Sequence, residues 1–148
     1  MLRKRLTVSG LAALGATAAV AATASAAAAP TITSLTEKQS GKAVTVTVKT
    51  KNLMLDPADV GKAPKAGKGH EHFAMDGGKY DYPKYSGANG KLAQQLGVQG
   101  KYSPSVTNKV TYTGLPKGTH TVTVYLVRNN HANYPNAAAK KTITFTVK

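Results

Sequence analysis

The segment Ala43-Val44-Thr45-Val46-Thr47-Val48-Lys49 alternates between valine and a polar side chain. Successive side chains of a β-strand point to opposite faces, so the three valines share one face and the threonines the other. Two later segments, residues 121–126 and 142–147, repeat this alternation of apolar side chains with threonine. All three segments therefore predict half-buried strands, each packed against a core on one side.

Weaker alternation predicts further strands at residues 31–35, 70–76 and 109–113. Turn-forming sequences follow at residues 76–78, which read Asp-Gly-Gly, and at residues 115–118, which read Leu-Pro-Lys-Gly. About six to seven short strands separated by such turns predict an all-β fold, a two-sheet sandwich of immunoglobulin-like type.

Two segments do not follow the strand pattern. Residues 52–69 are rich in Pro, Gly and Lys and predict an ordered crossing loop, whereas residues 79–107 form a long insertion rich in Tyr and Gly. Good helix formers between glycines at residues 90–97 predict a short helix within this insertion. Its aromatic rings either pack onto the sandwich or form an exposed platform for a ligand such as a sugar. These rings are Tyr80, Tyr82, Tyr85 and Tyr102.

The first residues resemble an export signal. A basic start at residues 3–5 precedes an uncharged stretch to about residue 22, and Ala24-Ser25-Ala26 gives the small-x-small pattern that a signal peptidase recognises. Thr, Ser and Gly lower the hydrophobicity of this stretch, whereas a retained membrane anchor needs about 20 strongly apolar residues. We expect a signal peptide over residues 1–29 and a single domain over residues 30–148. The domain would be secreted, extracellular or associated with the cell wall, with no membrane span after cleavage.

Composition limits the function classes. The chain has no cysteine, which excludes thiolate metal sites, thiol catalysis and disulfides. Without residues 3–5, 17 basic side chains face 6 acidic ones, for a net charge of about +11. The lysines are spread along the chain, which is typical of a solvated surface and suits an anionic cell-wall polymer as partner. The scattered positions of the lysines, the scarcity of Arg and the expected export all argue against nucleic acid as a binding partner.

The four histidines are sorted by strand parity. Phe73 is expected to face the core, so His70 and His72 face the other way, about 6.6 Å apart on one face of their strand. Two imidazoles at that spacing can converge on one metal ion. His120 shares the parity of the apolar core residues on the strand that it opens, whereas His131 follows the end of that strand with the opposite parity.

Strand direction then selects the cluster. If the two strands are antiparallel neighbours, His70 and His72 approach His131, while His120 lies towards Asp76 at the far end. We therefore predict a surface cluster of His70, His72 and His131 that binds Cu(II) or Zn(II). Tyr125 and Asn129 share the outward parity and are candidates for a second shell around the ion. His120 and Asp76 are predicted to be structural. The alternative is that all the histidines are structural, with Glu71 paired to a neighbouring lysine.

The motif spacing resembles a known family. The relevant sequence is Asp56-Pro57, then Gly67-Lys68-Gly69-His70-Glu71-His72, Asp76-Gly77, Leu115-Pro116-Lys117-Gly118-Thr119-His120 and Asn129-Asn130-His131. It is similar to a family of exported bacterial, actinobacterial-like, immunoglobulin-like domains of uncharacterised function that share a Gly-His-x-His-x-x-x-Asp-Gly motif. The resemblance implies the sandwich and export but no activity. Lys117 is a departure, because members often have Pro directly before Gly-x-His.

No enzymatic motif is present in the sequence. It contains no Gly-x-Ser-x-Gly and no His-Glu-x-x-His, and its six carboxylates offer no convincing acid–base pair. We expect that the protein is not an enzyme. The enzymatic alternative is redox chemistry at a copper ion bound by histidines. The predicted function is an exported metal-binding module. The alternative is a cell-wall-associated structural or interaction module that binds anionic polymers.

Overall fold

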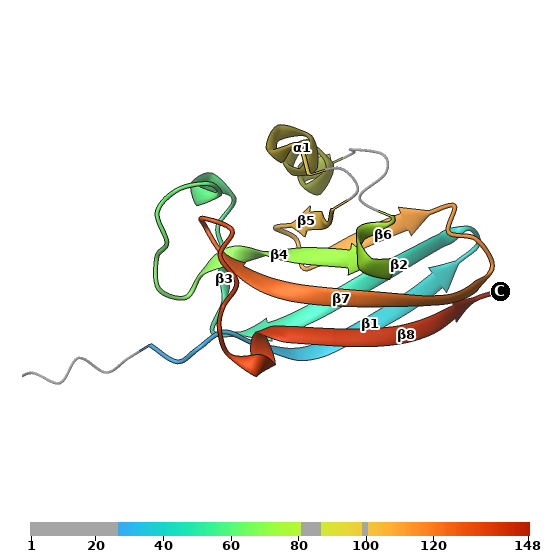
Figure 1. Ribbon diagram of the computed structural model, residues 1–148, viewed down its shortest axis with the longest axis horizontal. Coiled ribbons are helices and arrows are strands. Elements are labelled where there is room, and N and C mark those ends of the chain that lie inside the picture. The colour runs from blue at the N-terminus through green and yellow to red at the C-terminus, as the bar shows by residue number, and fades with distance from the viewer. Residues whose placement is uncertain (1–26, 81–86, 99–100) are drawn as a thin grey trace, which may run out of the picture.

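The computed structural model describes residues 27–80, 87–98 and 101–148. Within these residues, eight strands form two sheets that lie face to face (Figure 1). The smaller sheet has the order β1-β2-β6 and consists of β1 (Thr31–Ser40), β2 (Ala43–Lys51) and β6 (Lys109–Thr113). The larger sheet has the order β3-β4-β7-β8, with β5 added to β4; its strands are β3 (Met54–Leu55), β4 (Lys68–Met75), β5 (Ser103–Ser105), β7 (Gly118–Arg128) and β8 (Lys140–Val147). The predicted all-β, two-sheet sandwich is confirmed.

Alternating side chains of both sheets form the core, as their pattern predicts. On β2 and β7 every second residue belongs to one apolar cluster, and the polar residues between them are more exposed. Burying such a side chain contributes about 1.5–3 kcal/mol. The central members of the cluster are Val44, Val46, Val48, Phe73, Met75, Val110, Tyr112, Val122, Val124 and Leu126.

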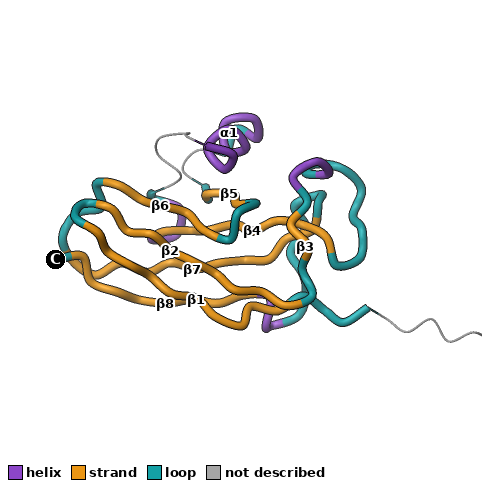
Figure 2. The backbone as a smooth tube through the Cα atoms, turned by 180° about the vertical axis from the view of Figure 1, so that it is seen from behind, coloured by secondary structure: helices purple, strands orange, loops and turns teal. Residues whose placement is uncertain are grey.

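All six predicted ranges contain strands, and the structure adds β3 and β5, which are too short to show periodicity. β5 lies in the long insertion, as does the helix α1 (Gly87–Leu96), which covers most of the predicted helical segment. Figures 1 and 2 show α1 beside β5 and β6, at one edge of the sandwich. Asn89 holds it there, because its side-chain NH₂ donates to Thr107 Oγ1 at 2.7 Å and to the Lys109 carbonyl at 2.8 Å.

Loops and short helices complete the described chain. The crossing loop contains the 3₁₀ helix η1 (Pro57–Asp59); η2 (Asp76–Gly78) follows β4, and η3 (Ala137–Ala139) precedes β8. In the described part of the chain, no helix has the length and apolar character that a membrane crossing requires. The predicted signal peptide up to residue 26, as well as Tyr82 and Tyr85, lie outside the described residues.

Candidate metal centre

The antiparallel pairing of β4 with β7 builds the histidine cluster. His70 lies opposite Val127 and His72 opposite Tyr125, so both imidazoles leave β4 on its outward face. The start of β4 meets the end of β7, at the end of the sandwich where the η1 loop also lies (Figure 1). There the chain turns after β7, and the His131 N–H donates to the Arg128 carbonyl at 2.9 Å. This turn brings His131 to the two strand histidines, as parity and strand direction require.

Three ring nitrogens face one another in the cluster. His70 Nε2 lies 3.0 Å from His72 Nε2 and 3.2 Å from His131 Nδ1, and the third side, from His72 Nε2 to His131 Nδ1, is 3.5 Å. A triangle with these sides has a circumscribed radius of about 1.9 Å. Zinc–nitrogen bonds are about 2.0–2.1 Å, which is close to this radius, so all three nitrogens could be bonded to one ion. The residues present therefore fit a three-histidine metal site.

Burial keeps these rings neutral. It lowers the pKa of His70 to about 4 and that of His72 to about 2, and the neighbouring histidines add to both shifts. Burial also lowers the pKa of His131 from its usual value. Neutral imidazole is the form that binds metal, so at neutral pH protons compete little for the three nitrogens.

The two strand histidines are buried and His131 is half-buried, whereas the sequence predicted a cluster on the surface. His70 is 0% exposed and His72 is 7% exposed. Tyr102, just before β5, stacks on the His72 ring with centroids 3.7 Å apart and planes 17° from parallel. The η1 loop closes on the same end, where the Gly61 N–H donates to the Asn129 carbonyl at 2.7 Å. The outward face of β4 is therefore covered by the insertion and the crossing loop.

The two predicted second-shell residues differ in their surroundings. Tyr125 is the cross-strand neighbour of His72, but its ring pairs with the Lys140 ammonium at 5.2 Å, and no hydrogen bond or ring contact to the cluster is present among the described residues. Asn129 is fully buried, and neither atom of its amide has a partner. His70 Nδ1, at the same end of the β4–β7 pair, is also buried without a partner.

Tyr102 is the neighbour of the cluster that sequence reasoning did not assign. The sequence offers two roles for the tyrosines of the insertion, and for the two described rings the structure supports packing rather than an exposed platform. Tyr102 stacks on His72, and Tyr80 meets His120 edge-on with centroids 5.8 Å apart. Residue spacing gives no signal for the Tyr102 contact, because a long insertion separates it from β4.

His120 lies at the far end of β7, away from the cluster. Its Nδ1 lies 2.7 Å from Asp76 Oδ2, and its Nε2 lies 2.8 Å from the Pro116 carbonyl. The second carboxylate oxygen of Asp76 accepts the Thr121 N–H at 2.8 Å. Burial alone would lower the pKa of His120, but the bonds to Pro116 and Asp76 outweigh it and raise this pKa. His120 and Asp76 therefore link the turn after β4 to the start of β7.

Glu71 is not part of the cluster and is not paired with a lysine. It points to the core face of β4, opposite its two histidine neighbours, and is fully buried. Its carboxyl oxygens make no hydrogen bond of good geometry. Burial raises the pKa of Glu71 to about 8, which the Ser105 side chain offsets in part. This acid is therefore a polar group within the sandwich core and not a fourth ligand.

Comparisons with protein-family models, with curated proteins and with solved structures found no match to the chain. The resemblance of the histidine motifs to a family of exported domains therefore stays a prediction.

Proposed function

We propose that the protein is an exported β-sandwich module that binds one Cu(II) or Zn(II) ion through His70, His72 and His131. The observation that carries the proposal is the mutual approach of three ring nitrogens to 3.0–3.5 Å in a buried site. Two of these ligands come from one strand, and the third comes from the turn after its partner strand.

The protonation chemistry of the cluster favours an ion over a purely structural role. A neutral imidazole nitrogen either carries a proton or is bare. Among three such nitrogens at least two are in the same state, so at least one of the three contacts joins two donors or two acceptors. That contact is unfavourable in a buried site, where polar groups need partners. A cation bound to three bare nitrogens removes the conflict.

The donor set supports a borderline-soft divalent ion. Imidazole suits zinc and copper, whereas calcium and magnesium prefer oxygen ligands. In the described part of the chain, no fourth histidine or carboxylate joins the group of three. We propose binding as the function rather than catalysis. We also propose that the protein acts outside the cell, because its sequence begins with the features of a signal peptide.

Calorimetric titration with Zn(II) and Cu(II) tests the proposal directly. We expect one ion per chain for at least one of the metals, with micromolar or tighter affinity. The His72→Ala variant should lose at least a hundredfold in affinity, because one of the three ligand nitrogens is removed. The other residues of the site, among them His70 and Tyr102, are unchanged. His120→Gln is the matched control: it also removes a buried imidazole, but at the far end of β7. Equal loss in both variants, or no binding to the native protein, would contradict the site.

His131→Gly separates metal binding from folding. His131 has a backbone φ of +66°, a left-handed conformation that suits glycine better than other residues. Relief of this strain opposes the extra freedom of glycine in the unfolded chain, so metal-free stability should stay within about 1 kcal/mol of the native value. Bound metal should stabilise the native protein by about 2.7 kcal/mol at a hundredfold excess over Kd, and this gain should vanish in the variant.

Denaturant melts with and without metal measure both quantities. A His131→Gly variant that keeps the full metal-dependent gain would remove His131 from the ligand set. A variant that is destabilised by several kcal/mol without metal would show instead that His131 is needed for the fold.

A further inference from the structure

The outward face of the smaller sheet carries a row of three lysines. Lys49 and Lys51 follow one another on this face of β2, because both have the parity opposite to that of its buried valines. Lys109 of β6 lies opposite Thr47, so it is the diagonal cross-strand neighbour of Lys49. All three side chains are exposed. This lysine row lies wholly within the domain that would remain after the expected signal-peptide cleavage.

The ammonium groups of the lysine row have no carboxylate partner among the described residues. The ion pairs that lysines make there are with Asp56 and Asp59, at the crossing loop. Glu71 is buried in the core, and Asp76 pairs with a histidine at the far end of β7. Glu37 lies on β1 but has core-facing parity, and one of its carboxylate oxygens is buried. The positive charge of the face is therefore not neutralised by these acids.

The outward face of the larger sheet has a different composition. Threonines of β7 and β8 form three directly opposed pairs there: Thr119 with Thr146, Thr121 with Thr144, and Thr123 with Thr142. The two lysines that share this face are both engaged, since Lys68 pairs with Asp56 and the Lys140 ammonium lies over the Tyr125 ring. Lysines with unpaired ammonium groups are therefore a property of the smaller sheet and not of both faces.

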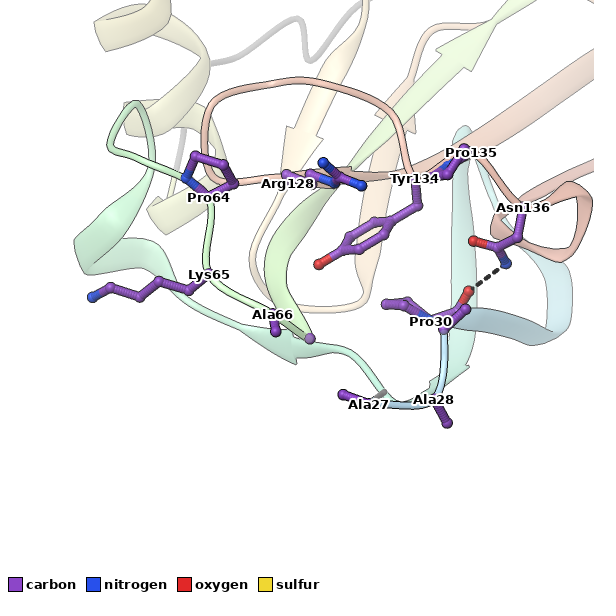
Figure 3. Close-up of a pocket in the computed structure, with 12 residues that line it drawn as sticks. Ala27, Ala28, Pro30, Pro64, Lys65, Ala66, Arg128, Tyr134, Pro135 and Asn136 are labelled. Atoms are coloured by element: carbon purple, nitrogen blue, oxygen red, sulfur yellow. Dashed lines mark hydrogen bonds between the residues drawn. The ribbon is translucent and has the colours of Figure 1, made fainter. Parts of the chain in front are cut away.

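The kind of cation on this face favours phosphate as the ligand. An ammonium binds phosphate as a point charge, whereas the planar fork of a guanidinium matches a carboxylate with two parallel hydrogen bonds. Arg128 is the one arginine of the described residues, and it ends β7 in the other sheet, where its guanidinium lies over the Tyr134 ring (Figure 3). Thr47, beside Lys49 and opposite Lys109, adds a hydroxyl that can donate to a phosphate oxygen.

The spacing of the lysine row matches the repeat of a polyol phosphate chain. The Cα atoms of Lys49 and Lys51 are about 6.6 Å apart along the strand, and those of the diagonal pair Lys49 and Lys109 are about 7–8 Å apart. Two residues of an extended chain span six backbone bonds. Six bonds also separate successive phosphorus atoms in a chain of three-carbon polyol phosphates. Successive phosphodiesters of such a chain can therefore reach successive ammonium groups.

Nucleic acid has the same charged group but fits the face less well. Single strands are bound on aromatic side chains that stack with the bases, and duplex readers insert a helix or a β-ribbon into a groove. In the described strands β1, β2 and β6, Tyr112 is the one aromatic residue, and it is 1% exposed in the core. The face offers lysines and hydroxyls on a sheet surface, without a stacking platform.

We infer that the lysine row binds a flexible anionic polymer whose repeat is a three-carbon polyol phosphate. Successive phosphodiesters pair with Lys51, Lys49 and Lys109, and the Thr47 hydroxyl donates to a phosphate oxygen. Binding of this kind suits a domain that acts outside the cell. It needs no metal, so it does not rest on the histidine site, and the tests below are made with a chelator present.

Titration of the native protein with three polymers of equal total charge tests the ligand class. The probes are poly(glycerol phosphate), polygalacturonate and single-stranded DNA. We expect poly(glycerol phosphate) to bind at least tenfold more tightly than polygalacturonate and at least as tightly as the DNA. Equal binding of polygalacturonate would overturn the preference for phosphate, and tighter binding of the DNA would make nucleic acid the partner. Absence of binding to poly(glycerol phosphate) would overturn the inference.

Two triple variants with the same loss of charge test the assigned face. Replacing all three lysines of the row by Gln should lower the affinity for poly(glycerol phosphate) at least tenfold. It should also lower the slope of log affinity against log salt by about 2, because three phosphate contacts are lost. The matched control replaces three exposed lysines elsewhere by Gln and should change the affinity less than threefold; these are Lys91, Lys117 and Lys141. Equal loss in both folded variants would show that net charge, and not this face, binds the polymer.

Discussion

Gly69→Ala is expected to lower the free energy of unfolding by about 4 kcal/mol or more, among the largest effects of any single substitution in this chain. A Cβ atom on Gly69 would lie 1.9 Å from the Val127 carbonyl oxygen and 3.0 Å from its carbonyl carbon. Both contacts are with backbone, so no side-chain rotation can relieve them. The β4 and β7 strands would have to separate at this position, and the hydrogen bonds between them would weaken.

The same substitution should also abolish metal binding. Gly69 lies opposite Arg128, directly before His70 and next to the turn that carries His131. A shift of even 1 Å between β4 and β7 would move His70 away from His131, whose ring nitrogens are now 3.2 Å apart. The measurement is a urea melt of the metal-free protein together with a metal titration at low temperature.

Gly41→Ala is the matched control for this prediction. Gly41 has a φ of +57°, but an added Cβ there would meet no atom within 4 Å. The control should cost only the left-handed penalty of about 1–2 kcal/mol and leave metal binding intact. If Gly69→Ala costs no more than the control, the strands can separate without loss and the close approach is not essential.

The contacts of the site that could be predicted are those that follow from side-chain alternation and strand direction. Alternation of side chains fixed the faces of β4 and β7, and antiparallel pairing then required His70, His72 and His131 to meet at one end. Both steps use local periodicity and one assumption about direction. The same reasoning placed His120 near Asp76, and the two side chains lie 2.7 Å apart.

Burial of the cluster could not be predicted in the same way. It depends on Tyr102, which reaches His72 only because β5 pairs with β4, and a strand of three residues has no readable period. Glu71 shows a second limit. Parity with Phe73 assigns it to the core, but charged residues are almost never fully buried without a partner, so the residue type favours pairing with a lysine. The tertiary fold overrides that preference at this position.

His120→Ala is expected to destabilise the protein by about 3 kcal/mol at pH 6, because it leaves the Asp76 carboxylate without its ion-pair partner. This is the lower end of the range for buried pairs, since the Asp76 side chain is 25% exposed. His120 is 4% exposed. Both of its ring nitrogens face acceptors, Asp76 Oδ2 at 2.7 Å and the Pro116 carbonyl at 2.8 Å. Only the protonated imidazole can donate to both. The charged ring is therefore the form that the fold stabilises.

The effect should depend on pH in a defined direction. The bonds to Pro116 and Asp76 raise the pKa of His120 in the folded protein, despite the opposing effect of burial. A raised pKa stabilises the fold fully below the unfolded value of about 6.5, and this contribution is lost as the pH rises through the folded value. The difference in unfolding free energy between the native protein and His120→Ala should therefore shrink from pH 6 to pH 9.

Urea melts of the native protein, His120→Ala, Asp76→Asn and the double variant at both pH values measure this dependence. Comparison at equal pH cancels the titration of His70, His72 and His131, which contributes with the opposite sign. Asp76→Asn removes the charge but keeps an acceptor oxygen, so the energetic coupling between positions 76 and 120 should be largest at pH 6. Lys79 is the nearby cation that opposes protonation of His120, so Lys79→Gln should keep the coupling detectable to a higher pH. A coupling that stays constant, or grows towards pH 9, would mean that His120 is neutral in the fold and acts by packing against Tyr80 and Phe145 alone.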